Sequence, residues 1–585
     1  MCTIFRVQGT TSNERRSHRL RLLWWPGVHL QVHQAASLVN PPADLVITGA
    51  EVYCGAPTGT WADAVAVRGD RIVAVGNEAE VRDRVGSAVN ALYLPGRMVA
   101  AGFQDAHVHP ATAGRHRLTV ALNEINGRQS YLDAVAQYAA ANPDEPWIVG
   151  GGWAMECFPG GRPTKDDLDA ILPNRPVFLF NRDVHGAWVN STALEIGGIT
   201  RDTPDPADGW IERDPRTGEA TGALHEGAAY SFNDNVVPAP DQGALETALL
   251  NAQAHLHSLG ITGWQDAWVT PETEAAYRAI AASGQLTARV VGALWWDRHR
   301  GLDQVDDLLA RREAGSVAGV GSFHPTSVKI MIDGVLENFT GALLEPYCDG
   351  HGGHTDNAGL AYLERAELDE AVTALDRHDF QVHMHAIGDR AVRNALDAVH
   401  TARSANGAGD QRHHIAHIQL VRPEDRARFG ELGVVANCQT YWAQMEPQME
   451  KLTIPFIGRD RADMQYPFAD LVRSGARIAM GSDWSVTTAN PLKQMEVAVN
   501  RIDPQNRSNA PFLPEQRLTL AQAISGFTLG TAYVNHDDES GSIEVGKRAD
   551  LVVLDRNVFA APAAELSDAS AELTISSGRV VFERP

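Results

Sequence analysis

Short apolar runs rich in β-branched residues alternate with helical stretches through the middle of this chain. The runs that predict strands lie at 176–180, 289–293, 327–331, 380–384, 433–437 and 477–480. Strands that alternate with helices form parallel β/α units, and the chain has enough of these units to close a barrel. The alternation therefore predicts an α/β fold of the TIM-barrel type.

The two ends of the chain show a different pattern of short strands. Residues 44–53 and 64–76 have the β-branched runs and Gly-Asp turn of a hairpin, and similar runs return at 541–555 and 573–582. Neither end carries enough strands to bury a core alone. We therefore expect both ends to pair in one small β-domain.

These patterns divide the chain into parts. Residues 44–98 and 536–585 are the two halves of the β-domain, and residues 99–535 are the barrel. A segment at 125–245, rich in Trp, Gly and Pro, is a long insertion after the first barrel strand, and such insertions often build lids over substrate sites. Residues 1–43, with five arginines and a single acid, are expected to be a flexible extension.

Composition narrows the class of protein and its partners. The formal net charge of −23 argues against nucleic acid or an anionic membrane as the partner, because both attract basic surfaces. No run approaches the roughly twenty apolar residues of a membrane span, and the five cysteines include no Cys-x-x-Cys pair. We therefore expect a cytoplasmic protein that acts on a small molecule, with no nucleic-acid or membrane partner. The sequence does not determine the oligomeric state, and a homo-oligomer is one of the alternatives.

Two histidines spaced i, i+2 stand at the end of the first barrel strand. His107 and His109 would point to the same face of that strand and could bind one metal ion. The pair alone does not establish a metal site, because the chain has 22 histidines and the spacing also arises by chance. Pro110 directly after the pair ends the strand and places both rings at its mouth.

Other polar residues end predicted strands in the same way. Lys329 lies within an apolar run, where an amine is costly unless it is neutralised, paired or modified; an edge-strand lysine that reaches solvent is the alternative. His385 and His417 close later strands, and His385 is preferred to His383, which comes earlier on the same strand. Asp483 follows a strand in Gly-Ser-Asp, a sequence that by itself more often forms a turn. Since the carboxyl ends of barrel strands meet at one face, we expect a site shared with the histidine pair.

The order His-x-His, Lys, His, His, Asp along β/α units resembles the amidohydrolase superfamily. The surrounding motifs resemble its amidohydrolase-3, YtcJ-like branch, which includes N-substituted formamide deformylases. The matching segments are 95–109, 152–153, 163–164, 168–169, 185–190, 221–226, 328–334, 346–347, 385–391, 417, 481–484 and 546–552. The resemblance covers residues 44–585 and implies a distorted TIM-like (β/α)8 barrel with a composite β-sandwich built from both chain ends.

The resemblance also implies a role for each member of the series. The implied metal ligands are His107, His109, Lys329, His385, His417 and Asp483. Asp483 would in addition be the catalytic acid and base, and Lys329 would be a carboxylated lysine that bridges two metal ions. The expected cofactor is one or two divalent ions, with zinc favoured by the imidazole ligands.

Such a site predicts hydrolysis of a carbon–nitrogen bond of an amide, N-acyl or formamide type by a metal-activated water. Asp483 would move the proton, and His185 in the insertion would stabilise the oxyanion. Trp153, His185, Trp188 and Glu226 are expected to contact the substrate. Core packing of the aromatic side chains and a helix cap at Glu226 are the alternatives.

Other reactions on the same scaffold stay open. The chain could be a deaminase, an esterase, a cyclic amide hydrolase, or a metal-dependent decarboxylase or isomerase. A different class is a non-catalytic regulatory protein that has retained the barrel. The complete ligand set argues against this class, because a protein without catalytic duty has little reason to keep every ligand.

Overall fold

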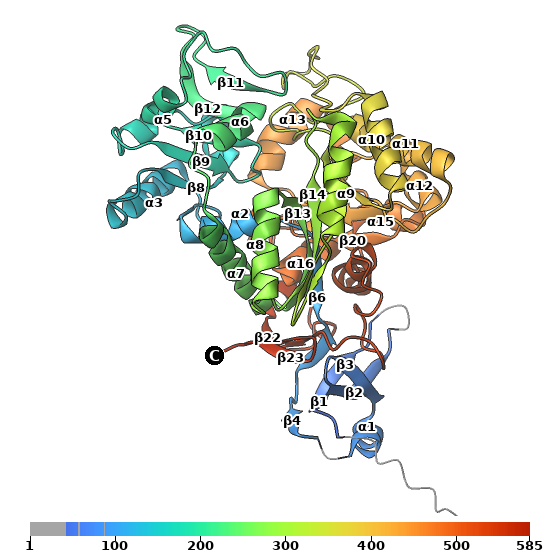
Figure 1. The fold of residues 1–585 in the computed structure, drawn as a ribbon. Helices are drawn as coiled ribbons and strands as arrows, with labels where there is room; N and C mark the ends of the chain where they lie inside the picture. Colours follow the sequence, from blue (N-terminus) through green and yellow to red (C-terminus); the bar gives the residue numbers. More distant parts are fainter. Residues whose placement is uncertain (1–41, 56–58, 87) are drawn as a thin grey trace, which may run out of the picture. The chain divides into compact units, whose positions relative to one another are not determined.

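A nearly closed barrel of parallel strands forms the centre of the structure, a computed structural model that describes residues 42–55, 59–86 and 88–585 (Figure 1). Eight of the described strands follow one another around the barrel in sequence order. They are β6 (Phe103–Val108), β13 (Ile261–Val269), β14 (Arg289–Trp295), β16 (Ser322–Met331), β17 (Gln381–Ala386), β18 (His414–His417), β19 (Val435–Cys438) and β20 (Ile478–Met480). All pairings between neighbours in this series are parallel. The predicted α/β barrel is therefore confirmed.

The first and last barrel strands meet at a seam that has no regular ladder among the described residues. The backbone N–H of Asp483 donates to the His107 carbonyl at 2.7 Å, and the backbone N–H of His109 donates to the Trp484 carbonyl at 2.8 Å. These bonds tie the segment after β20 to the end of β6. The seam thereby fixes the distance between the histidine pair and Asp483.

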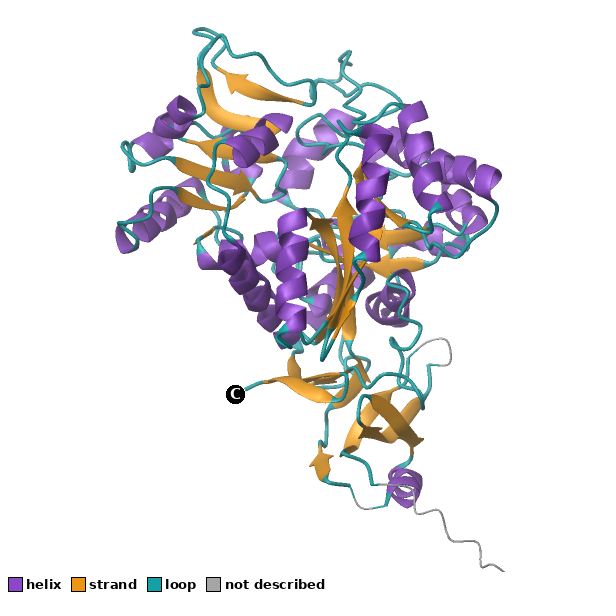
Figure 2. Cartoon of the chain, viewed as in Figure 1, coloured by secondary structure: helices purple, strands orange, loops and turns teal. Residues whose placement is uncertain are grey.

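Helices cover the outside of the barrel (Figure 2). They include α7 (Gln242–Ser258), α8 (Pro271–Ala282), α9 (Val305–Glu313), α10 (Arg365–Arg377), α11 (Asp389–Asn406), α12 (Pro423–Leu432), α15 (Phe468–Arg473) and α16 (Pro491–Asn500). In α11 the buried residues Ala391, Ala395, Ala398 and Ala402 recur every three to four positions, so one face packs inward. No helix in the described part of the chain is long and apolar enough to cross a membrane.

Strands from the two chain ends share one sheet. Its main path is β23-β22-β21-β5-β1-β2-β3, with β4 paired to β1. These strands are β1 (Leu45–Tyr53), β2 (Trp61–Arg68), β3 (Arg71–Gly76), β4 (Asn90–Tyr93), β5 (Met98–Ala101), β21 (Leu551–Leu554), β22 (Ala571–Ser576) and β23 (Arg579–Glu583). Antiparallel pairing of β21 with β5 joins the two ends, and Ile47, Val65, Val99, Leu551 and Ile575 are fully buried in their common core. The predicted β-domain from both ends is confirmed.

Gly102 carries the chain from this sheet into the barrel. Its N–H donates to the Asp550 carbonyl at 2.8 Å. A Cβ at this position would lie 2.6 Å from the Thr262 side chain, so a larger residue would force the two layers apart. The β-domain and the first barrel strand are thus packed directly against each other.

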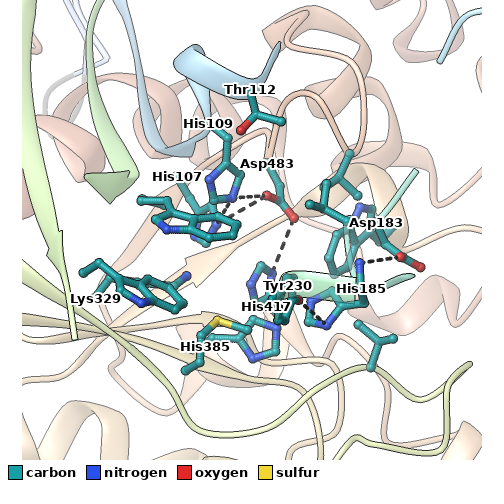
Figure 3. Close-up of a pocket in the computed structure, with 18 residues that line it drawn as sticks. His107, His109, Thr112, Asp183, His185, Tyr230, Lys329, His385, His417 and Asp483 are labelled. Atoms are coloured by element: carbon teal, nitrogen blue, oxygen red, sulfur yellow. Dashed lines mark hydrogen bonds and ion pairs between the residues drawn. The ribbon is translucent and has the colours of Figure 1, made fainter. Parts of the chain in front are cut away.

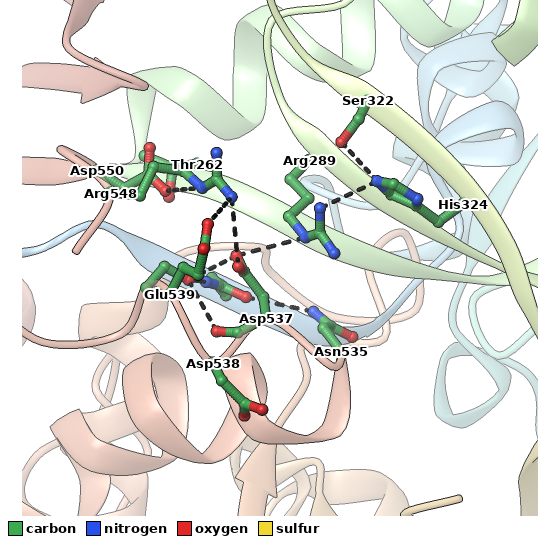
Figure 4. A network of polar contacts seen from close by, with 12 residues as sticks. Thr262, Arg289, Ser322, His324, Asn535, Asp537, Asp538, Glu539, Arg548 and Asp550 are labelled. Carbon is green, nitrogen blue, oxygen red and sulfur yellow. Dashed lines mark hydrogen bonds and ion pairs between the residues drawn. The ribbon is translucent and has the colours of Figure 1, made fainter. Parts of the chain in front are cut away.

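A charged cluster lies at the amino-terminal end of the barrel strands (Figure 4). Arg289, the first residue of β14, pairs with Asp537 at 3.4 Å. Arg548 contacts Glu539 at 3.1 Å, Asp537 at 3.8 Å and Asp550 at 3.9 Å. We call these five residues the floor cluster, in which each guanidinium faces carboxylates.

The insertion forms a sheet of its own, in the order β11-β12-β10-β9-β8-β7. Its strands are β7 (Val120–Ala121), β8 (Ile148–Trp153), β9 (Val177–Asn181), β10 (Gly186–Val189), β11 (Gly209–Arg213) and β12 (Ala220–Glu226). The run at 176–180 is therefore not a barrel strand, because β9 pairs within this sheet and is antiparallel to β10. The second barrel strand is β13, which the sequence patterns missed. The predicted extension at 1–43 lies outside the described residues except for Pro42 and Ala43.

Candidate metal centre

The residues predicted to bind metal come together in one cavity at the carboxyl ends of the barrel strands (Figure 3). His107 is the next-to-last residue of β6, Lys329 lies on β16, His385 on β17 and His417 at the end of β18. His109 directly follows β6, and Asp483 is the third residue after β20. All six line the cavity. The strand-end pattern in the sequence thus located one shared site.

Three ligand atoms converge most closely. Nε2 of His107 and Nε2 of His109 are 3.3 Å apart, and Asp483 Oδ1 lies 3.3 and 3.0 Å from them. Zinc–nitrogen bonds of about 2.05 Å in a tetrahedron give ligand–ligand distances of about 3.3 Å. Asp483 Oδ1 and His109 Nδ1 are buried without a hydrogen-bond partner. The donor set therefore fits a divalent metal ion, with His417 within reach of the same position.

Local backbone structure holds these ligands in place. Asp483 and His417 have φ of 55° and 75°, a left-handed conformation that is uncommon outside glycine and is typical of functional sites. Buried Asp105 accepts hydrogen bonds from the backbone N–H of His107 and of Ser482, each at 3.0 Å, and from the Ser482 hydroxyl. Asp105 thereby ties the two ligand-bearing segments together across the seam.

A second group of candidate ligands lies beside the first. The rings of His385 and His417 are 4.4 Å apart. His385 Nδ1 is 3.2 Å from Asp333, whose carboxylate is held by three backbone N–H donors. The Lys329 amine points into the cavity (Figure 3), and burial lowers the pKa of Lys329 to about 7, against the opposing effect of Asp483. These side chains could hold a second ion.

His185 reaches the same cavity from the insertion, between β9 and β10. Its Nδ1 lies 2.8 Å from Glu226 Oε2, and its ring centre lies 5.5 Å from that of His385. Burial alone would lower the pKa of His185, but the charge and hydrogen bond of Glu226 raise it to about 9. Thr340 donates a hydrogen bond to the other Glu226 oxygen. His185 is therefore a cationic donor at neutral pH.

The inner cavity is walled by aromatic side chains and shares part of its wall with a larger, more polar cavity. Trp268 and Trp295 stack with ring centres 4.9 Å apart, and Tyr230 and Trp442 complete this wall. The outer cavity has a volume of about 840 Å³ and shares Asp183, Val335, Trp442 and Val486 with the inner one.

Three of the four predicted substrate contacts do not line the cavities. Trp153 and Trp188 line neither cavity; they are buried in the core of the insertion. Their indole N–H groups donate to the carbonyls of Leu179 and Thr164. Core packing is therefore the correct interpretation of both. Glu226 does not line the cavity either and acts through His185.

Sequence patterns missed the aromatic wall and the supports of the ligands. Trp295 ends β14 and Trp268 is the next-to-last residue of β13, so their position near strand ends was a usable signal. His383 was also passed over, although its spacing i, i+2 from His385 places both on the inward face of β17.

The sequence and the fold agree on the class of protein that this site defines. Residues 94–582 match the model of the amidohydrolase family. The chain belongs to this family.

Curated relatives cover most of the chain. It is 30% identical to Protein LONG AFTER FAR-RED 3 of Arabidopsis thaliana, over 89% of each chain. It is 27% identical to the putative amidohydrolase YtcJ of Bacillus subtilis, over 92% of this chain and 99% of the relative. It is also 27% identical to N-substituted formamide deformylase of Arthrobacter pascens, over 92% and 98%. The resemblance seen in the sequence is thus confirmed.

A solved structure shares the fold. The crystal structure of an uncharacterized metal-dependent hydrolase from Pyrococcus horikoshii aligns with a TM-score of 0.69 at 22% identity. The alignment covers 88% of this chain and 97% of that one.

Proposed function

We propose that this protein is a metal-dependent hydrolase that cleaves a carbon–nitrogen bond of a small amide, N-acyl or formamide substrate. The observation that carries the proposal is the convergence of His107 Nε2, His109 Nε2 and Asp483 Oδ1 at 3.0–3.3 Å. A divalent ion held there, zinc by the preference of imidazole ligands, would supply a Lewis acid that lowers the pKa of water toward about 7.

Asp483 moves the proton in this mechanism. Its Oδ1 faces the histidine pair, whereas Oδ2 is oriented toward His417, 4.0 Å from Nδ1. Oδ2 is therefore available to accept a proton from the attacking water and to return it to the leaving nitrogen. The same carboxylate thus serves as base in the first step and as acid in the second.

His185 would stabilise the oxyanion from the opposite side of the cavity. It is held as a cation by Glu226, and its position between Glu226 and the ligand histidines is fixed by the hydrogen bond at Nδ1. A charged donor at the wall of a mostly apolar cavity stabilises the negative charge that develops on the carbonyl oxygen.

The cavity walls favour a substrate with an aromatic or bulky apolar group. Trp268, Trp295, Trp442 and Tyr230 surround the space next to the ligands. The relative named N-substituted formamide deformylase supports a carbon–nitrogen bond as the target. Ester, cyclic amide and deamination reactions are the rivals within the same chemistry.

Lys329 is proposed to be carboxylated. It is 2% exposed and its amine points into the cavity (Figure 3). A neutral amine that adds carbon dioxide releases one proton and becomes an anionic carbamate, which would pair with a second metal ion. Carbon-13 NMR in ¹³C-labelled bicarbonate would show a carbamate signal that is absent in Lys329→Met.

A substrate panel tests the function. Protein loaded with zinc, manganese or cobalt is offered formamides, N-acyl amines, esters and cyclic amides, each with an aromatic and a small aliphatic group. We expect turnover of open-chain amides, with the aromatic members favoured. The proposal fails if no amide in the panel is hydrolysed by any metal form.

A regulatory protein that retained the barrel is the alternative of another class. The Arabidopsis relative carries a name that states no chemical activity. Asp483→Asn separates the two classes, since a hydrolase loses turnover while a regulator keeps its function.

A further inference from the structure

A chain of buried polar side chains runs from His107 into the barrel interior. His107 Nδ1 is 2.8 Å from His383 Nε2, and His383 Nδ1 is 2.7 Å from Gln265 Oε1. Gln265 Nε2 then donates to Gln381 Oε1 at 3.0 Å. None of these four side chains is more than 3% exposed. The donor and acceptor roles in each of these hydrogen bonds therefore constrain those in the next.

Backbone carbonyls fix the donor and acceptor directions in this series of hydrogen bonds. Gln381 Nε2 donates to the carbonyls of Arg412 and Val534, at 3.0 and 2.6 Å. A carbonyl can only accept, so the Gln381 amide cannot be reversed. The Oε1 atom of Gln381 must therefore face Gln265. The Gln265 Nε2 group donates to this oxygen, which leaves Gln265 Oε1 facing the histidines.

The fixed Gln265 oxygen determines the proton positions on the imidazoles. It accepts from His383 Nδ1 and from His414 Nε2 at 2.8 Å, so both nitrogens carry hydrogen. The hydrogen-bond partners of buried His383 are Gln265 and His107, and neither is a carboxylate that would stabilise a second proton on its ring. The Nε2 of His383 is then a bare lone pair that accepts the proton of His107 Nδ1.

A second backbone anchor agrees with this assignment. Asn437 Nδ2 donates to the Ala106 carbonyl at 2.9 Å and to His414 Nδ1 at 3.1 Å. The carbonyl fixes the Asn437 amide, which leaves His414 Nδ1 bare and Nε2 protonated. The same tautomer of His414 follows from both sides of the network.

We propose that His383, Gln265 and Gln381 are positioning residues that hold His107 as its Nδ1–H tautomer, with the Nε2 lone pair presented to the metal ion. The inference rests on the proposed metal site but not on the reaction. Partners of a ligand histidine's second nitrogen fix its ring and raise its basicity, and their loss weakens metal binding about 10- to 100-fold.

A branch of the network leads to the floor cluster. Gln265 Nε2 also donates to Asn535 at 3.2 Å, Asn535 to Gln104 at 3.4 Å, and Gln104 to Ser540 at 2.7 Å. The Ser540 hydroxyl donates to Asp537 at 2.6 Å. In each of these hydrogen bonds the residue nearer the metal centre is the donor, and the last acceptor is the carboxylate of Asp537. The far end of the barrel thus supports the same His107 tautomer.

Metal affinity tests the proposal directly. Zinc dissociation constants are measured by competition with a chromophoric chelator for the full-length protein and its variants. We expect His383→Leu and Gln265→Met to bind zinc about 10- to 100-fold more weakly. His383→Gln, whose amide can accept from His107 and donate to Gln265, is expected to recover most of the loss. Ser540→Ala, at the far end of the branch, is expected to have a smaller effect in the same direction.

His257→Leu is the matched control. His257 is also a buried histidine with partners on both nitrogens, the Ile261 carbonyl and Thr287, but it lies outside the network. We expect it to lower thermal stability and leave zinc affinity unchanged. Wild-type affinity in folded His383→Leu and Gln265→Met would overturn the proposal, as would equal losses in His383→Gln and His383→Leu. A protein that binds zinc in the expected order yet hydrolyses nothing would refute the proposed function alone.

Discussion

Polar side chains gather at both ends of the barrel, but their interactions differ between the two ends. In the floor cluster, Arg289 and Arg548 lie against carboxylates, so opposite charges compensate each other. At the carboxyl ends, His107 and His109 direct Nε2 atoms toward each other and toward Asp483 Oδ1. Nitrogen and oxygen atoms that converge in this way favour a cation between them. The difference separates a cluster that holds the fold from one that binds a ligand.

Replacing one aspartate by asparagine at each end of the barrel is expected to show the largest difference between the two clusters. Asp483→Asn is expected to reduce kcat by about 10²–10⁴-fold, because an amide cannot take the proton from water. Asp550→Asn in the floor cluster should leave kcat unchanged. Steady-state kinetics on the best substrate of the panel measures both variants. Equal activity of the two would remove the distinction between the barrel ends.

Glu226→Gln is expected to have the next largest effect. Burial lowers the pKa of His185 and Glu226 raises it to about 9, so without this carboxylate the imidazole is neutral at pH 8. We expect kcat/KM at pH 8 to fall about tenfold or more, with the alkaline limb of the profile moved to lower pH. Glu212→Gln, which affects the His225–Glu212 pair in the insertion, is the control. A profile unchanged in Glu226→Gln would exclude a cationic His185 from the reaction.

The same pair makes stability depend on pH. A pKa raised in the folded state gives stability that is fully present below the unfolded value of about 6.5 and is lost as pH rises through about 9. The free energy of unfolding should therefore fall between these pH values in the wild type. Denaturant titrations should show a flatter dependence in Glu226→Gln, and an identical slope would contradict the ion pair.

Arg289→Met should change stability without changing turnover. The substitution leaves buried Asp537 with fewer partners, which is expected to lower the free energy of unfolding by about 1–3 kcal/mol. Chemical denaturation measures this loss, and kcat with saturating metal should stay at the wild-type value. A large loss of kcat in the folded variant would mean that the floor cluster takes part in the reaction.

The grouping of the candidate ligands could be predicted because each lies at or near the carboxyl end of a strand. In a parallel barrel the strand ends meet at one face, so order along the chain became proximity in space for His107, Lys329, His385 and Asp483. The β-domain was predictable because neither end of the chain carries enough strands to bury a core alone, so the strands of the two ends had to pair with each other.

The substrate wall could not be predicted in this way. Aromatic side chains in the insertion are buried either in its own core or in the cavity, and this depends on tertiary packing. Trp153 and Trp188 are buried in that core, whereas Trp268 and Trp442 come from barrel segments. Strand β13 was missed because its inward face carries polar Gln265, whose role depends on His383 and Gln381.

Anomalous diffraction from crystals of the zinc-loaded protein tests the central claim most directly. Data on either side of the zinc absorption edge locate the ion without reference to the protein model. We expect a peak between His107 Nε2, His109 Nε2 and Asp483 Oδ1, within about 2.0–2.2 Å of each. Zinc-loaded crystals with no peak at these atoms, or with zinc only elsewhere, would contradict the assignment.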